Sequence, residues 1–266
     1  RAQSIGHSNA YFLVHGDRQN HLIDIIKQAN EWKQILERAI EDQQVIFHFQ
    51  PVLRLPDRQL MAEEVYVRIS LDDQVIQAGV FMPMAERFNL LASLDQLIIT
   101  RAFEEITTSS PTLIINLSTR SIQDGQFVQW LTSHIRDHSA LASKVIFELQ
   151  EYAVHLAYDT IKFLIDSAGP LGYRFSIDHF GLGTVAFSYL QSLDVHFIKV
   201  DRSFVTDIAN NTDNQFFIQS VVQIAHTRDM LLIAEGVETE GDLATLERLG
   251  VDAAMGYLLG RPGPRS

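Results

Sequence analysis

Five polar side chains stand at or just after the ends of short apolar runs: Asn116, Glu148, Asp178, Asp201 and Glu235. Any one of them could be a helix N-cap that follows a strand. Five residues in the same position relative to their runs are better explained by one shared site. Converging carboxylates repel one another, and a bound cation is the usual resolution. The pattern therefore predicts an acidic site that suits a hard divalent cation such as Mg²⁺ or Mn²⁺.

Two basic residues offer these acids a partner other than a metal. Lys199 stands two residues before Asp201, and Arg68 lies near the end of a β-rich run that also contains Glu64. A buried network of ion pairs among Lys199, Arg68 and the acids would neutralise the charge without any ion. The residues thus leave two alternatives open, a site that holds Mg²⁺ or Mn²⁺ and a site with no metal.

The polar residues depend on short β-rich runs that alternate with helical stretches after residue 43. The runs are VIFHFQPV (45–52), LMAEEVYVRI (60–69), TLIINLS (112–118), KVIFELQ (144–150), RFSID (174–178), HFIKVD (196–201), MLLIAE (230–235) and DAAMGY (252–257). Eight such runs predict an α/β fold, a closed (β/α)8 TIM-like barrel, with an open doubly wound sheet as the alternative. The shared strand-end position favours the barrel, because the strand ends of a barrel converge on one mouth.

The first 43 residues do not follow this alternation. Residues 30–44 place Trp32, Ile35, Leu36, Ala39 and Ile40 on one side of an amphipathic helix, which packs on the barrel or links it to an upstream domain. The expected division is a tail or linker at 1–29 and the barrel domain at 30–266.

Composition limits the partners of this domain. The 266 residues include 21 Lys and Arg against 33 Asp and Glu, a formal net charge of −12. So acidic a chain is a poor non-specific partner for DNA, RNA or anionic lipid. It contains no cysteine, which excludes disulfides and thiolate metal sites. No apolar run approaches the roughly 18 residues that span a membrane. We expect a cytoplasmic domain cut from a longer protein, whose missing part could carry an inner-membrane anchor.

The polar residues fall within strings that resemble the EAL domain of bacterial cyclic di-GMP phosphodiesterases, from about residue 30 to the end. The strings come in the order of that family: FQPV (49–52), EVYVR (64–68), NLS (116–118), FEL (147–149), IDHFGLG (177–183), IKVDRSFV (198–205), AEGVETE (234–240) and GYLLGRPGP (256–264). One tripeptide would be weak evidence, but the ordered set is specific. RAQSIGHSNAYFL (1–13) resembles the last stretch of a GGDEF domain, which implies such a domain upstream; a disordered leader is the alternative.

The resemblance implies a role for each matching residue. Glu64, Asn116, Glu148 and Asp178 would bind one metal, and Asp178 would bridge to a second metal held by its neighbour and Glu235. Glu64 and Lys199 are the implied catalytic residues, with Lys199 orienting or activating the attacking water. The implied contacts to cyclic di-GMP are Gln50, Glu64, Tyr66, Arg68, Asn116, Asp178, Lys199, Asp201, Glu235 and Glu238. Arg68 would contact a phosphate and Gln50 the ligand at the barrel floor, while Glu238 would support the site.

Three departures from the family cluster at the chemistry. The paired acids of the family read Asp178-His179 here, so that a neutral imidazole replaces an oxygen ligand of the second metal. The following loop, usually Phe-Gly-Thr-Gly-Tyr-Ser-Ser, reads Phe180-Gly181-Leu182-Gly183-Thr184-Val185-Ala186 here. Val65 and Tyr66 replace the Ala-Leu of the signature, and Tyr66 either stacks on a guanine or only fills the space of the leucine.

The retained and lost positions favour a receptor over an enzyme. Ligand contacts persist while a position of the second metal changes, a combination that resembles the degenerate EAL domain of LapD-type membrane receptors. FMPMAERF (81–88) and HFG (179–181) resemble that subgroup most. The alternatives are an active or weakly active phosphodiesterase that makes pGpG, and a protein-binding scaffold without nucleotide. A homodimer is expected from the family, and the sequence does not identify a downstream protein partner.

Overall fold

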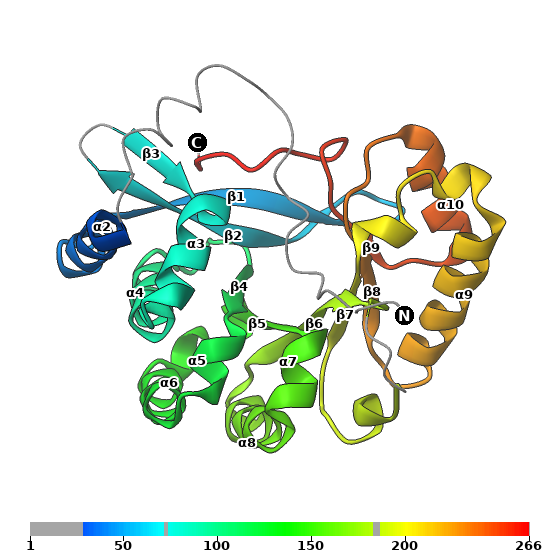
Figure 1. Cartoon of the computed structure of the whole chain (residues 1–266). Helices are drawn as coiled ribbons and strands as arrows, with labels where there is room; N and C mark the ends of the chain where they lie inside the picture. The colour runs from blue at the N-terminus through cyan, green and yellow to red at the C-terminus, as the bar shows by residue number, and fades with distance from the viewer. Residues whose placement is uncertain (1–28, 72–73, 183–186, 266) are drawn as a thin grey trace, which may run out of the picture.

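The computed structural model describes residues 29–71, 74–182 and 187–265, which form a closed barrel with helices around it (Figure 1). The barrel strands are β1 (Val45–Arg54), β2 (Leu60–Leu71), β4 (Leu113–Leu117), β5 (Val145–Gln150), β6 (Arg174–Phe180), β7 (Phe197–Val200), β8 (Leu231–Ala234) and β9 (Ala253–Ala254). The ring closes because β1 pairs with both β2 and β9. All eight predicted runs contain barrel strands, which confirms the barrel and excludes the open sheet.

The first connection departs from the expected alternation of strand and helix. Residues 55–59 join β1 to β2 with no helix between them, and five residues are too few for a crossover connection. The first two strands therefore form an antiparallel hairpin, whereas neighbouring strands from β2 through β4 to β9 pair in parallel. The described chain also contains β3 (Gln74–Gln77), which pairs with the end of β2 beyond the ring.

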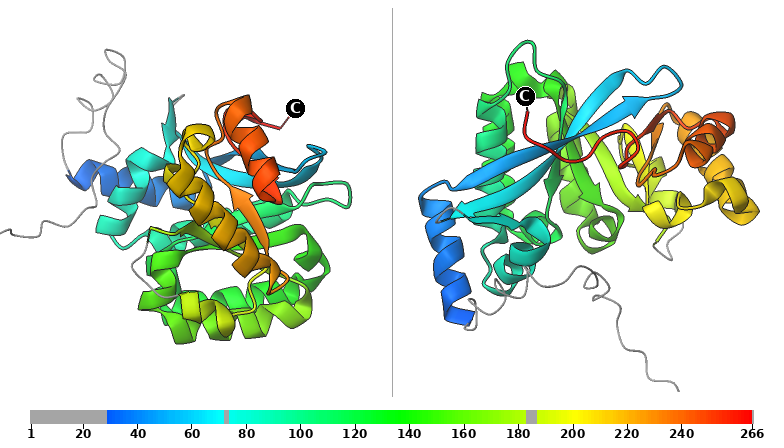
Figure 2. Two further views of the ribbon diagram at one scale, coloured as in Figure 1. Left: turned by 90° about the vertical axis from the view of Figure 1, so that its right-hand side faces the viewer. Right: turned by 90° about the horizontal axis from the view of Figure 1, so that it is seen from above.

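The helices surround the strand ring, as two further views show (Figure 2). They are α2 (Ala29–Glu41), α3 (Ala78–Arg87), α4 (Leu91–Glu104), α5 (Thr119–Gln123), α6 (Gly125–Asp137), α7 (Glu151–Leu156), α8 (Tyr158–Ala168), α9 (Thr212–His226) and α10 (Glu240–Leu249). Short 3-10 turns include η3 (Phe187–Gln191) and η4 (Arg202–Phe204). The C-terminal segment returns to β1, where Gly263 bridges to Phe49. None of the helices among the described residues is long and apolar enough to cross a membrane.

The expected N-terminal helix is present as α2. Trp32, Leu36 and Ala39 are buried, and Ile35 and Ile40 pack against the core, as the one-sided pattern predicted. The helix therefore packs on the barrel. The tail at 1–28, with its proposed GGDEF-like remnant, lies outside the described residues.

A small apolar cluster fills the inside of the barrel and positions the polar residues. It consists of Val52, Ala62, Ile114, Ile146, Phe197, Ile233, Ala253 and Met255. Side chains two residues apart on a strand share one face. Glu64, Asn116, Glu148, Lys199 and Glu235 each stand two residues after a member of this cluster. They consequently form a polar layer above an apolar one, at the C-terminal ends of the parallel strands.

Candidate functional site

Lys199 is the centre of the polar layer. Its ammonium Nζ lies 2.9 Å from Glu64 Oε2, 2.5 Å from Glu148 Oε1 and 3.3 Å from Asp178 Oδ1. The side chains of Lys199 and Glu148 are almost wholly buried, at 1% and 0% exposed. Burial would lower the pKa of Lys199, but Glu148, Glu64 and Asp178 more than reverse this and hold that pKa well above its usual value.

Three carboxylates share this one ammonium, so the layer holds excess negative charge. Burial raises the pKa of Glu148 well above its usual value, and the charges of Asp178 and Glu64 add to the effect while Lys199 opposes it. Burial likewise raises the pKa of Glu235. A group whose pKa is raised in this way holds a proton more readily than in water, and a cation at the same place competes with that proton.

Asn116 brings an amide to the same cluster. It stands near the end of β4 and its Nδ2 donates to Glu64 Oε1 at 3.1 Å. Two carboxylate oxygens of the cluster, Glu148 Oε2 and Asp178 Oδ1, are buried without a hydrogen-bond partner among the described residues, although Asp178 Oδ1 is ion-paired with Lys199. Such atoms are rare in folded proteins and are often explained by an ion or water.

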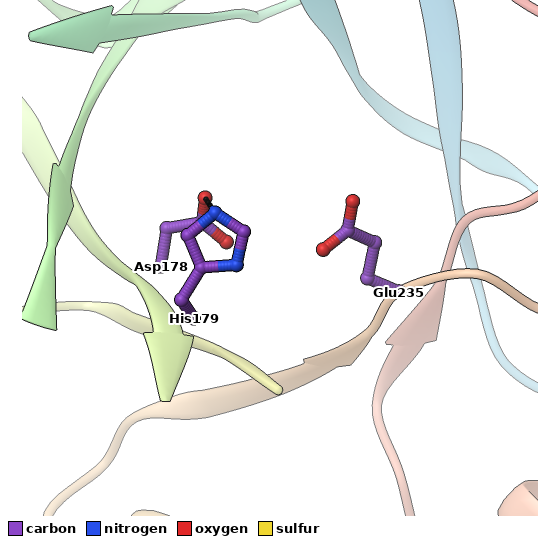
Figure 3. Close-up of side chains that lie close together, drawn as sticks. All are labelled: Asp178, His179 and Glu235. Carbon is purple, nitrogen blue, oxygen red and sulfur yellow. Dashed lines mark ion pairs between the residues drawn. The ribbon is translucent and has the colours of Figure 1, made fainter. Parts of the chain in front are cut away.

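His179 closes the side of the site that faces Glu235. Asp178 and His179, at the end of β6, point towards Glu235, which follows β8 (Figure 3). One ligand atom from each of the three lies within 4.8 Å of the others. His179 Nδ1 is 3.0 Å from Asp201 Oδ2, and His179 Nε2 is 3.4 Å from Asp178 Oδ2. The imidazole is thus held between two acids that the sequence placed in the site.

The backbone and the neighbouring turn fix the position of His179. Its φ of +55° lies in the left-handed region, an unfavourable conformation for a residue with a Cβ. Asp201 caps η4 by accepting from the backbone amide of Ser203. Burial would raise the pKa of Asp201, but the hydrogen bonds from Ser203 and His179 outweigh burial and lower that pKa. Asp201 is therefore an ionised anchor for the imidazole.

A wall of polar side chains rises from the floor of the site along β1 and β2. Gln50 pairs across the strands with Glu64 and donates through Nε2 to the carbonyl of Gly260 at 2.9 Å. Tyr66 and Arg68 follow Glu64 on the same face of β2, at two-residue steps. Burial, and then the charge of Glu64, raises the pKa of the Tyr66 phenol, which therefore stays protonated. The buried Nε of Arg68 has no hydrogen-bond partner among the described residues.

A barrel with a polar layer at its mouth agrees with the family to which comparison with known proteins assigns the chain. The sequence profile of the EAL domain matches residues 33–262, most of the chain. The chain belongs to the EAL family. The division into a tail at 1–29 and an EAL domain at 30–266 stays a prediction.

Three relatives illustrate the range of proteins that this EAL domain resembles. It is 28% identical over 236 residues to the bifunctional diguanylate cyclase/cyclic di-GMP phosphodiesterase MucR of Pseudomonas aeruginosa, covering 86% of this chain and 34% of MucR. The FimX EAL domain of P. aeruginosa, solved bound to c-di-GMP, matches with a TM-score of 0.80 and 27% identity, covering 88% of this chain and 96% of that EAL-domain chain. Vibrio cholerae LapD bound to c-di-GMP matches with a TM-score of 0.79 and 22% identity, and the match covers 87% of this chain and 57% of the LapD chain.

These comparisons establish the family and leave the subgroup as a proposal. At 22% identity the likeness to LapD shows the fold alone. The EAL domain spans about a third of the length of the curated relatives that it matches first. These relatives therefore contain long regions to which this chain has no counterpart in the match.

Glu238, one of the predicted site residues of this EAL domain, lies apart from the acids around Lys199. Glu238 is exposed and lines a separate hollow with Asp207, Asn210 and Asp242, beside the start of α10. It follows Glu235 by three residues, and the turn at Gly236, with a φ of +77°, redirects the chain between them. The supporting role of Glu238 therefore stays a prediction, since Glu238 lines a different hollow.

Two structural residues of the site carried no clear signal in the sequence. Asp95 looks like a helix cap, but it lies buried inside α4 and accepts from the backbone amide of Ser118, two residues after Asn116. Glu151, at the start of α7, accepts from the backbone amide of Gly181 and from the Tyr189 hydroxyl. It thereby fixes the chain just after His179. Residues 183–186 of the altered loop lie outside the described residues.

Proposed function

We propose that this EAL domain is a receptor that binds cyclic di-GMP at the barrel mouth and hydrolyses it negligibly. The observation that carries the proposal is the placement of His179 between Asp178 and Asp201, facing Glu235. By resemblance, an acid at this position would serve a second metal. The FimX EAL domain, 27% identical to this chain, was solved with c-di-GMP bound, which supports the choice of ligand.

The polar layer fits one hard divalent cation. Glu64, Glu148 and Asp178 offer carboxylate oxygens, and Asn116 offers an amide oxygen. Mg²⁺ and Mn²⁺ prefer oxygen ligands, and the buried carboxylate oxygens of Glu148 and Asp178 are suitable ligand atoms. A metal bound here would neutralise a ligand phosphate and would compete with Lys199 for the same carboxylates.

The second group of ligands fits Mg²⁺ poorly. Asp178, His179 and Glu235 combine two carboxylates with one imidazole. Replacing an anionic oxygen by a neutral nitrogen removes charge and favours softer ions such as Zn²⁺. In two-metal phosphodiester hydrolysis the paired ions activate the water and stabilise the leaving oxygen. An EAL domain that holds only one ion therefore keeps ligand binding and loses most of the rate.

An active or weakly active phosphodiesterase is the second candidate. It is favoured by the intact contacts among Glu64, Glu148, Asp178 and Lys199, and by the name of the relative MucR. In that case His179 would act as a nitrogen ligand of the second metal. A scaffold without nucleotide has less support, because Arg68 and Lys199 are retained in the mouth.

The subgroup and the setting of the domain follow the same proposal. A LapD-type receptor would have a GGDEF-like domain upstream, pair as a homodimer and stand on the cytoplasmic side of an inner membrane. These features remain predictions for the full-length protein.

Arg68→Ala is expected to weaken cyclic di-GMP binding by tenfold or more. The Nε of Arg68, on the face of the mouth, has no hydrogen-bond partner among the described residues and can donate to phosphate oxygens. Hydrogen bonds to charged groups contribute roughly 1.5–3 kcal/mol, and about 1.4 kcal/mol is tenfold in affinity. Titration calorimetry measures the change.

Arg58→Ala is the matched control for this variant. Arg58 lies in the turn of the same β1–β2 hairpin and is ion-paired with Glu240 on the surface. We expect wild-type affinity from it. A folded Arg68→Ala domain that also binds like the wild type would show that Arg68 does not contact the ligand.

A further inference from the structure

The β1–β2 hairpin extends beyond the barrel rim on the side of the mouth. β4 pairs with β2 only at Glu63 and Glu64, whereas β1 stays paired with β2 as far as Ile69. At about 3.4 Å a residue, the four steps from Glu64 to Arg68 extend the hairpin by roughly 14 Å. The hairpin is therefore a wall that stands over the polar layer.

One face of this wall looks into the mouth. Directly opposite residues of an antiparallel pair put their side chains on the same face, and so do residues two apart on one strand. Gln50 pairs with Glu64, His48 with Tyr66, and Ile46 with Arg68. Glu64 reaches Lys199 inside the barrel. His48 and Ile46 therefore lie on the face that carries Tyr66 and Arg68, although nothing in the family strings pointed to either.

This face holds two polar atoms without partners. His48 Nδ1 and Arg68 Nε are both buried and make no hydrogen bond to any described residue. They are diagonal neighbours across the strands, because His48 lies opposite Tyr66 and Arg68 follows Tyr66 by two residues. Buried polar atoms normally have a hydrogen-bond partner. Two such atoms without a described partner, together on one face of a binding site, indicate a ligand that supplies the missing hydrogen bonds. Ile46, 37% exposed, adds an apolar surface next to Arg68.

The chemistry of the face suits a purine better than a cation. Beyond Glu64 it carries Ile46, His48, Tyr66 and Arg68, with no carboxylate among them. Aromatic and apolar side chains offer area to the flat face of a base. Guanine presents two acceptors, O6 and N7, on one edge, whereas adenine replaces O6 by an amino donor. An N–H donor beside an arginine thus suits guanine.

We propose that His48 donates a hydrogen bond to O6 of a guanine in the bound cyclic dinucleotide and makes the mouth select guanine over adenine. This inference rests on the proposed function. The imidazole can present either edge, because its terminal torsion is broad and roughly two-fold. His48 would act together with Arg68, and independently of any metal bound at the polar layer.

The test compares two ligands and two replacements at one position. The domain and its His48→Phe and His48→Gln variants are titrated with cyclic di-GMP and cyclic di-AMP by calorimetry, without divalent metal. His48→Phe keeps a ring and loses the hydrogen bond, so we expect roughly five- to tenfold weaker binding of cyclic di-GMP. His48→Gln restores a donor and is expected to recover most of that loss. Binding of cyclic di-AMP should change by less than about twofold, because adenine has an amino donor in place of O6 and makes no such bond.

A control and the contrary outcomes separate this inference from the receptor proposal. His226→Phe, on the exposed end of α9, should leave both affinities unchanged. If the wild type binds cyclic di-GMP and His48→Phe binds it equally well, the role of His48 is overturned and the receptor stands. An equal loss of both ligands would show that His48 only supports the fold. A wild-type domain that binds neither ligand would overturn both proposals.

Discussion

Mixed with cyclic di-GMP and Mg²⁺, the purified domain is expected to bind the ligand without converting it to linear pGpG. The reason is His179, which brings no negative charge to the group formed with Asp178 and Glu235. Imidazole nitrogen is a poor Mg²⁺ ligand, and loss of one of two metals removes several kcal/mol of transition-state stabilisation. Roughly 4 kcal/mol corresponds to a thousandfold in rate. Binding is followed by calorimetry and product by chromatography.

The EAL domain of MucR, assayed in the same buffer, is the reference for an enzyme named as a phosphodiesterase. His179→Asp should raise turnover without reaching that reference, because the substitution restores an acid but not the altered loop after it. Ligand affinity should change less than turnover, since ground-state contacts are separate from those made in the transition state. Multiple turnovers by the unmodified domain in Mg²⁺, abolished by Glu64→Ala, would establish an enzyme instead.

Lys199→Met is expected to cost about 3–5 kcal/mol of unfolding free energy in the absence of divalent metal. The ammonium of Lys199 is the cation that Glu64, Glu148 and Asp178 share, and it is almost wholly buried. Its removal leaves these acids uncompensated in a medium where charge is costly. Denaturant unfolding followed by circular dichroism measures the loss. Mg²⁺ or Mn²⁺ should restore more stability to this variant than to the wild type, because the metal replaces the missing cation.

Lys162→Met is the matched control, since Lys162 pairs with Asp166 on the surface of α8 at 3.0 Å. Exposed pairs of this kind contribute about 0–1 kcal/mol, so a small effect is expected. A loss below about 1 kcal/mol for Lys199→Met as well would mean that the acids of the mouth take up protons and relax. The buried ion-pair network would then contribute little to the stability of the fold.

Local patterns in the sequence predicted the frame of this protein. Each barrel strand is a short β-rich run, and each polar residue at a strand end projects from the position its run dictates, because side-chain direction on a strand follows from residue spacing alone. The one-sided spacing of Trp32, Leu36 and Ala39 likewise predicted α2. The ordered family strings then identified the EAL domain, which the profile match confirms.

Tertiary structure decided which side chains meet. Three features depend on how distant segments pack. They are the antiparallel pairing of β1 with β2, the burial of Asp95 inside α4 and the position of Glu238 apart from Glu235. His48 had one available signal, its position two residues before Gln50, but only the register with β2 places it opposite Tyr66. Register is fixed by pairing between segments rather than within one of them, and a slip of one residue would turn each side chain to the other face. The sequence by itself therefore determined the strands and the polar layer, while the closed barrel decided which side chains lie next to Lys199, His179 and His48.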